Sequence, residues 1–144
     1  MIETGEEKDN LMAKELKGNF SVITGACNKV ASKLTPQGVA PGAHFGDGLV
    51  DLIIVNKTSR FNYFRYLYRS AFLNSNPFEL PFVERIKVRE FRFRPIHEKS
   101  GITDHKNKTC TSVWNCDGEV LSHAEIYVKV HCQILPVFAR GPEI

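Results

Sequence analysis

The sequence predicts a mainly β domain: an antiparallel, β-sandwich-like arrangement with one amphipathic helix. Three stretches support this fold class: an apolar run at 49–55, a strict apolar–polar alternation at 124–134, and a helical period at 60–72. Antiparallel strands accompanied by a single helix indicate a two-layer β domain. Only four or five strands are evident, which is few for a closed sandwich, so we expect the fold to be incomplete.

The beginning of the chain is rich in charged residues. Residues 1–18 mix Glu, Lys and Asp with isolated apolar residues, so we expect a disordered segment or a frayed helix there. A single β domain would then occupy residues 19–144. Its first strand is predicted at 20–26, and the Pro and Gly residues of 33–48 predict an ordered loop.

The following stretches predict buried strands. Residues 49–55 are apolar except for Asp51, which is typical of a strand buried on both faces or on most of them. Residues 82–95 alternate, but their period shifts between Val88 and Phe91, which indicates a β-bulge. The bulge would bring five apolar residues to one face: Phe82, Ile86, Val88, Phe91 and Phe93. The opposite face would then be basic, with Arg85, Lys87, Arg92 and Arg94.

The C-terminal third combines a loop with another strand. Residues 96–109 are polar and predict a loop, whereas 124–134 predict a half-buried antiparallel strand. Residues 137–139 favour one more short strand.

One segment has helical periodicity. From Arg60 to Phe72, four aromatic residues fall on one helical face: Phe61, Phe64, Tyr68 and Phe72. We expect this face to be the apolar one, with Tyr66 on the polar side together with the arginines. Ser59 is suited to cap the N-terminus, and Asn74 with Pro77 would end the helix.

Composition excludes several classes of function. With 42% hydrophobic and 24% charged residues the chain is typical of a globular domain, and its net charge of +3 does not imply a nucleic-acid partner. No signal peptide is recognisable, and no run reaches the roughly 18 apolar residues of a membrane span. Four scattered cysteines favour a reducing, cytoplasmic environment.

Two acidic motifs carry alternative interpretations. Asp117-Gly118-Glu119 is either a simple Asp-Gly hairpin turn or a pair of carboxylates that orients a hydroxyl or holds a magnesium-bound nucleotide. Asp47, between Gly46 and Gly48, could share a hard cation with Asp51, although a turn leading into a strand explains the same residues.

Other candidates are less specific. His97, His105, Cys110 and Cys116 lie close in sequence, but their spacing does not match a structural zinc site. Arg65 and Arg69 could form a basic stripe that contacts phosphate or lipid headgroups, or a solvated helix face. No Walker or Rossmann glycine loop is present in the sequence.

Taken together, several segments resemble the C-terminal part of ceramide kinases, within the diacylglycerol, sphingosine and ceramide lipid kinase superfamily. The resemblance follows family order from about Lys17 to Gly141. The matching segments are Gly46-Asp47-Gly48 with Asp51-Leu52-Ile53, Ser59-Arg60-Phe61-Asn62 with Arg65 and Arg69, Phe82-Val83-Glu84, Trp114-Asn115-Cys116-Asp117-Gly118-Glu119-Val120, and Val130-His131-Cys132-Gln133 with Phe138-Ala139-Arg140-Gly141.

This resemblance implies transfer of the γ-phosphate of ATP to the hydroxyl of ceramide or a related sphingolipid, with Mg²⁺, on a peripheral membrane surface. It implies that Asp117, Gly118 and Glu119 contact the nucleotide and that Glu119 assists at the acceptor hydroxyl. It also links Asp47 to magnesium in some relatives. The family's Gly-Gly-Asp-Gly segment belongs to an N-terminal kinase domain and is absent from this sequence.

We therefore expect the chain to lack kinase activity by itself and to need that N-terminal domain as a partner. The alternative is a non-catalytic β module that binds lipid or membrane, or that regulates a complete kinase.

Overall fold

The computed structural model describes residues 2–5, 14–31, 38–71, 76–96, 113–136 and 138. Parts of four predicted elements fall outside these ranges: the loop at 33–48, the end of the helix after Ala71, the polar loop at 96–109 and the strand at 137–139.

The described residues form antiparallel sheets and one α-helix. Sheet A has the strand order β2-β1-β6-β9, sheet B has the order β3-β4-β5, and β7 pairs with β8 in a hairpin. The predicted mainly β fold class is therefore confirmed. The elements are β1 (Ile2–Gly5), β2 (Lys14–Leu16), β3 (Phe20–Ala26), β4 (Val50–Asn56), α1 (Arg60–Ala71), the 3-10 turn η1 (Pro77–Glu79), β5 (Val83–Val88), β6 (Glu90–Phe93), β7 (Trp114–Cys116), β8 (Glu119–Leu121) and β9 (Ile126–Lys129).

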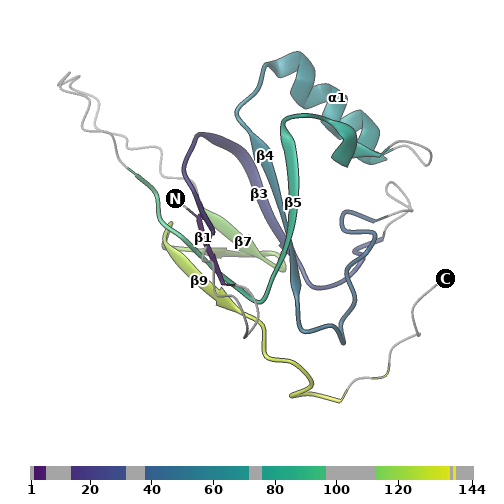
Figure 1. Ribbon diagram of the computed structural model, residues 1–144, viewed down its shortest axis with the longest axis vertical. Helices are drawn as coiled ribbons and strands as arrows, with labels where there is room; N and C mark the ends of the chain where they lie inside the picture. The colour runs from purple at the N-terminus through teal and green to yellow at the C-terminus, as the bar shows by residue number, and fades with distance from the viewer. Residues whose placement is uncertain are drawn as a thin grey trace.

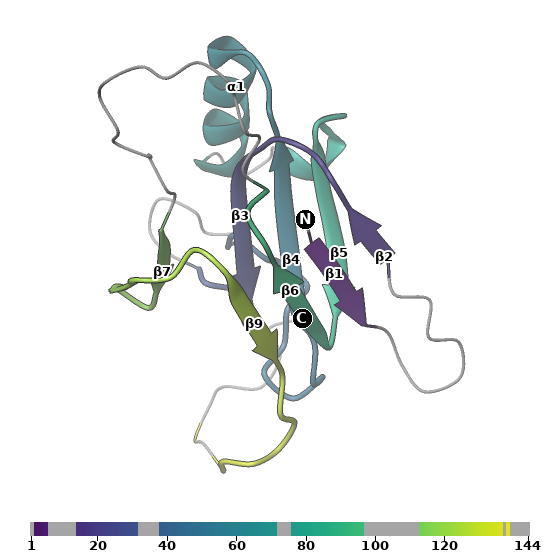
Figure 2. The same cartoon turned by 90° about the vertical axis from the view of Figure 1, so that its left-hand side faces the viewer.

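Strand β4 lies at the centre of the fold and is buried on both faces, as its apolar run predicted. Val50, Leu52 and Ile54 belong to the core that sheet B shares with sheet A. The alternate residues Ile53 and Val55 belong to a second core beneath α1. Sheet A and α1 thus cover opposite faces of sheet B, and Figures 1 and 2 show this order of layers.

Helix α1 begins where predicted, but it packs through the opposite face. The hydroxyl of Ser59 accepts a hydrogen bond from the backbone N–H of Asn62, which confirms the predicted cap. Tyr66 is only 8% exposed and packs in the core, whereas Phe64 is 69% exposed. The aromatic face is thus the exposed one, because aromatic periodicity alone does not reveal which side of a helix meets the sheet.

The predicted irregularity between Val88 and Phe91 is real, but it joins two sheets. The strand breaks at Arg89, so that β5 ends in sheet B and β6 continues into sheet A. Val88 and Phe91 still enter the same core, as do Ile86 and Phe93. Phe82 packs instead with the core under α1.

The basic face expected along this segment is divided between the two sheets. Arg85 and Lys87 belong to β5 in sheet B. Arg92 lies on β6 in sheet A, and the side chains of Arg92 and Arg94 both approach Glu125. The four cations therefore do not form one surface.

The N-terminal segment contains strands where disorder or a frayed helix was expected. Strand β1 pairs with both β2 and β6, and Ile2 is fully buried. These strands have three or four residues, too few for their alternation to be recognised among charged neighbours. Residues 6–13 lie outside the described ranges.

Strand β9 is shorter than the alternation at 124–134 predicted. Its register follows β6 from Glu90 to Phe93, and β6 has no further residues to pair with. Val130 makes one more hydrogen bond, to the carbonyl of Arg89, and still packs in the core. Ile134 is exposed instead of facing inward.

The reversed helix face can be tested by a pair of substitutions. Tyr66→Ala should lower the free energy of unfolding by on the order of 3 kcal/mol, because it leaves a cavity in the core. Phe64→Ala should change it by less than about 0.5 kcal/mol, because that ring already faces solvent. Urea denaturation measures both values. A larger loss for Phe64→Ala than for Tyr66→Ala would contradict this packing.

Candidate functional site

The Asp117-Gly118 pair forms the tight turn of the β7–β8 hairpin. Both residues have positive φ angles, 49° and 100°, as a type I′ turn requires. The side-chain oxygen of Asn115 accepts a hydrogen bond of 2.9 Å from the N–H of Gly118, and Cys116 pairs with Glu119 across the turn. These residues thus form the predicted Asp-Gly turn, and both carboxylates are exposed at its tip.

Trp114 anchors this hairpin to sheet A. Its indole N–H donates a hydrogen bond of 2.9 Å to the carbonyl of Ala124. Its ring meets Phe93 edge-on, with 5.5 Å between centroids, and packs in the shared core. The Trp-Asn lead-in therefore has two structural tasks: the indole fixes the base of the hairpin, and the Asn115 amide closes its turn.

The carboxylate of Asp117 faces the same region as two other aspartates. The pKa of the Cys27 thiol is raised, first by burial and then by the negative charges of Asp47, Asp117 and Asp51. Since Coulomb interactions fade with distance and screening, these three carboxylates surround one part of the molecule. The charges of the hairpin tip and of the Asp47 loop therefore both act on the Cys27 thiol, which directly follows β3.

The loop around Asp47 is held by specific hydrogen bonds. One carboxylate oxygen of Asp47 accepts from the N–H of Leu49 at 2.9 Å, and the other lies 3.3 Å from the ammonium of Lys87. Lys87 also donates to the carbonyl of Gly42 at 2.8 Å. The φ of Gly48 is 68°, and a Cβ there would lie 3.2 Å from the sulfur of Cys132.

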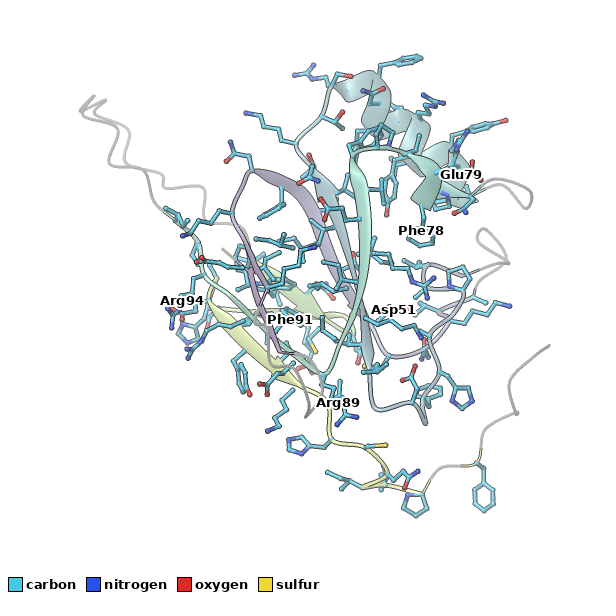
Figure 3. The ribbon with its side chains drawn as sticks, viewed as in Figure 1. Asp51, Phe78, Glu79, Arg89, Phe91 and Arg94 are labelled. Carbon is cyan, nitrogen blue, oxygen red and sulfur yellow. The ribbon has the colours of Figure 1, made fainter. Side chains whose placement is uncertain are left out.

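Asp51 is a buried carboxylate under this loop. It is 1% exposed, and its Oδ2 accepts a hydrogen bond of 2.6 Å from the guanidinium of Arg85. Its Oδ1 has no hydrogen-bond partner and lies 4.0 Å from the Lys87 ammonium. Arg85 also lies over the ring of Phe78, 5.4 Å from its centroid. Figure 3 shows Asp51 and Phe78 on the side of sheet B that faces α1 and this loop.

Sequence reasoning missed Arg85 and Lys87 as partners of the aspartates. The antiparallel register pairs Asp51 with Lys87 and Ile53 with Arg85, so that all three polar side chains share one face. Asp51 is the single charged residue of β4, and Arg85 and Lys87 alternate with Ile86 in β5, but only a known register reveals that they meet.

The Lys87 ammonium lies where the sequence suggested a cation shared by Asp47 and Asp51. Within the described ranges, no three His, Cys, Asp or Glu residues come together as metal ligands. His97, His105 and Cys110 of the zinc hypothesis lie outside those ranges, and Cys116 is exposed. A magnesium role for Asp47 stays a prediction.

The structure does not bring Arg65 and Arg69 to this end of the sheets. Both lie on α1, across sheet B from the core that contains Trp114 (Figure 1). Arg69 donates to Glu79 at 3.1 Å and to the carbonyl of Asn76 at 3.2 Å, which ties the helix to η1. Arg65 is exposed on the outer side of the helix.

Comparison with known proteins identifies the family. The chain matches the family described as "Ceramide kinase C-terminal domain" over residues 3–143. It belongs to the ceramide kinase C-terminal domain family. A ceramide kinase from Homo sapiens is 38% identical over 88% of the chain, and one from Mus musculus is equally similar. A ceramide kinase from Arabidopsis thaliana is 33% identical over 89% of the chain.

The chain spans only part of these relatives. It covers 27% of the human and mouse ceramide kinases and 19% of the Arabidopsis protein. No solved structure matches it significantly. Among the residues described here, α1 is too short to cross a bilayer, and no candidate membrane-spanning helix is found.

The convergence of carboxylates around Cys27 predicts a change in thiol reactivity. Asp117→Asn should lower the pKa of Cys27 and speed its alkylation by iodoacetamide near pH 8, because one negative charge near the thiolate is removed. Mass spectrometry of the Cys27 peptide measures the rate. Glu125→Gln, an exposed carboxylate paired with Arg94, serves as the control and should leave the rate unchanged. Equal rates in the Asp117→Asn variant and the unaltered chain would contradict this placement of the hairpin.

The buried aspartate gives a second prediction. Asp51→Ala should destabilise the fold by about 2 kcal/mol, because Arg85 loses the carboxylate that pairs with it. The loss stays moderate because water partly reaches the Arg85 side chain. Adding Arg85→Met should restore part of the loss, since no unpaired charge then remains. Denaturation with urea compares the variants. If Arg85→Met lowers the free energy of unfolding by as much in the Asp51→Ala variant as in the unaltered chain, the two residues are not coupled.

Proposed function

We propose that the chain is the C-terminal part of an ATP-dependent lipid kinase that phosphorylates ceramide. The observation that carries this proposal is the family match, which includes the Asp117-Gly118-Glu119 hairpin within residues 3–143. In the reaction, the ceramide hydroxyl oxygen attacks the γ-phosphorus of ATP and ADP leaves with the electrons of the broken P–O bond. The hydroxyl proton passes to a base. Such transfer depends chiefly on positioning and on charge stabilisation.

The hairpin is suited to one side of such a site. Glu119 presents an exposed carboxylate beside a rigid two-residue turn, and a carboxylate can accept the proton of an attacking hydroxyl. Asp117 lies one position into the turn and its charge reaches the region of Asp47. We assign the contact with the nucleotide to Asp117, Gly118 and Glu119, and assistance at the acceptor hydroxyl to Glu119.

Magnesium fits the donors available at this end of the sheets. Mg²⁺ is commonly held by one or two carboxylates together with substrate phosphates, without a complete protein cage. Asp47 would supply such a carboxylate, for which it would have to exchange its Lys87 contact. When bound, the ion would neutralise charge on the phosphate oxygens.

This chain would act together with a further domain. Its 144 residues contain no Gly-Gly-Asp-Gly segment, and the ceramide kinases it resembles are several times longer. We therefore assign the phosphate-binding half of the site to an N-terminal kinase domain. The assembled enzyme would act at the cytoplasmic surface of a membrane, to which it binds peripherally.

A chimera tests this function. The C-terminal segment of human ceramide kinase is replaced by this chain, and phosphorylation of a dispersed short-chain ceramide by ATP and Mg²⁺ is measured. We expect activity from the chimera and none from the chain alone. Glu119→Ala should lower kcat by about 100-fold or more if Glu119 takes the hydroxyl proton, and should raise KM for ATP if it only contacts the nucleotide.

The matched control is Glu125→Ala, which removes an exposed carboxylate on the outer side of sheet A. It should retain the activity of the chimera. Robust ceramide phosphorylation by the isolated chain would refute the requirement for an N-terminal kinase domain. Unchanged kcat and KM in the Glu119→Ala chimera would show that Glu119 has no role in the active site.

The alternative function is a non-catalytic module that binds a membrane. The basic strand face that suggested it is split between two sheets, and Arg69 is engaged by Glu79. The outward aromatic face of α1 favours this membrane-binding function, and it is compatible with the kinase function as well.

A further inference from the structure

Helix α1 carries an exposed aromatic stripe on the side that faces away from sheet B. Phe61, Phe64 and Tyr68 are 78%, 69% and 60% exposed, and their spacing of three and four residues places them on one face. Leu67 lies beside them and is also exposed. Isolated exposed apolar residues need no explanation, but a contiguous group of large ones marks a surface that is covered in use.

The buried side of the same helix makes this exposure informative. Tyr66 packs in the core, and Tyr63 packs against it with 6.2 Å between ring centroids. The helix is therefore already docked through a complete face of its own. The outer stripe is not needed to hold α1 on sheet B, so its aromatic residues require another occupant.

The charges around the stripe indicate what that occupant is. Residues 57–71 contain four cations and no acidic residue. Arg60 and Arg65 are exposed on the helix, and Lys57 is exposed just before it, whereas Arg69 is paired with Glu79. Aromatic side chains flanked by arginine and lysine on one face are typical of helices that lie in the headgroup region of an anionic membrane.

A groove beside the start of α1 adds polar groups to this surface. It has a volume of about 470 Å³ and is lined by Ser21, Thr58, Arg60, Tyr63 and Phe64. It thus offers three hydroxyls and a guanidinium together with two aromatic rings, a combination that suits an anionic headgroup above an acyl boundary.

We propose that the outer face of α1, formed by Phe61, Phe64, Leu67 and Tyr68 with Arg60 and Arg65, binds the surface of a membrane that contains anionic phospholipids. The helix lies parallel to the bilayer, its aromatic rings enter the boundary between headgroups and acyl chains, and the arginines contact phosphates. This inference rests on the proposed action at a membrane surface and names the residues that hold the domain there.

The experiment uses the purified 144-residue chain and vesicles of phosphatidylcholine with or without 30% phosphatidylserine. We expect sedimentation with the anionic vesicles only, weakening as salt rises, because salt screens the arginines. Phe61→Ser with Phe64→Ser should weaken binding by on the order of tenfold or more, since two rings leave the interface. Arg60→Glu with Arg65→Glu should weaken it by at least about 25-fold, at roughly fivefold for each cation lost.

Two matched controls carry the same chemical changes elsewhere. Phe45→Ser alters a ring that is 61% exposed on the loop before β4. Arg92→Glu with Arg94→Glu changes the net charge equally on the outer side of sheet A. Both should bind as the unaltered chain does. Binding lost equally in the charge control would show attraction by net charge alone and would overturn the proposal.

Depth can be measured with Phe64→Trp and vesicles of brominated phosphatidylcholine and phosphatidylserine. The new indole should be quenched, whereas Trp114, which packs beside Phe93, should not be. No binding to anionic vesicles, or unchanged binding by the Phe61→Ser/Phe64→Ser chain, would refute the proposal. If the unaltered chain does not bind vesicles but self-associates, and the Phe61→Ser/Phe64→Ser chain does not self-associate, this face binds a second copy of the chain instead.

These outcomes are separable from those of the kinase test. Phosphorylation of a dispersed short-chain ceramide by the chimera requires no vesicle, so the Phe61→Ser/Phe64→Ser chimera should keep that activity. It should lose activity only on ceramide embedded in anionic vesicles. Loss on both substrates would place the helix in catalysis or assembly of the enzyme and would contradict a role confined to the membrane.

Discussion

The burial of β4 on both faces is the constraint on which the structure depends. A strand without an exposed face must be covered twice, and this chain covers it with sheet A on one side and with α1 and the Asp47 loop on the other. Alternate residues of one strand therefore define two cores. The polar exception, Asp51, lies on the loop side, where Arg85 and Lys87 compensate its charge. The order of the layers follows from these seven residues.

Two different ends of this layered structure carry the polar surfaces. The carboxylates of the hairpin tip and of the Asp47 loop act on Cys27, whereas α1 presents aromatic rings and cations on its outer face, away from sheet B. In the proposed kinase, a carboxylate-bearing edge and a basic, aromatic face on one small domain would let the nucleotide and the lipid surface approach from different directions. A lipid kinase has to accommodate both, because one substrate is dissolved and the other is embedded.

Much of this fold could be predicted from the sequence, wherever a repeating apolar–polar pattern covers enough residues to be recognised. Strand β3 and the helix appear at the expected residues, and β4 is shifted by a single position. The face of α1 could not be predicted, because its most apolar residues are the exposed ones and the core uses the amphipathic Tyr63 and Tyr66 instead. The strands β1 and β2 are too short to show a period. For the site, the turn geometry at Asp117-Gly118 was predictable from the dipeptide, but the pairing of Asp51 with Lys87 depends on the register between two residues that lie 36 positions apart in the sequence.

The change of sheet at Arg89 has a consequence for the acidic end of the molecule. The Asp47 loop is attached to sheet B, whereas the Asp117 hairpin is fastened through Trp114 to sheet A. Between β5 and β6 the backbone passes from one sheet to the other through Arg89 alone, and the Val130 amide holds its carbonyl. Because the two groups of carboxylates are attached to different sheets, a change in the angle between the sheets would change the distance between the groups. The core that the two sheets share therefore helps to set how far apart these carboxylates lie.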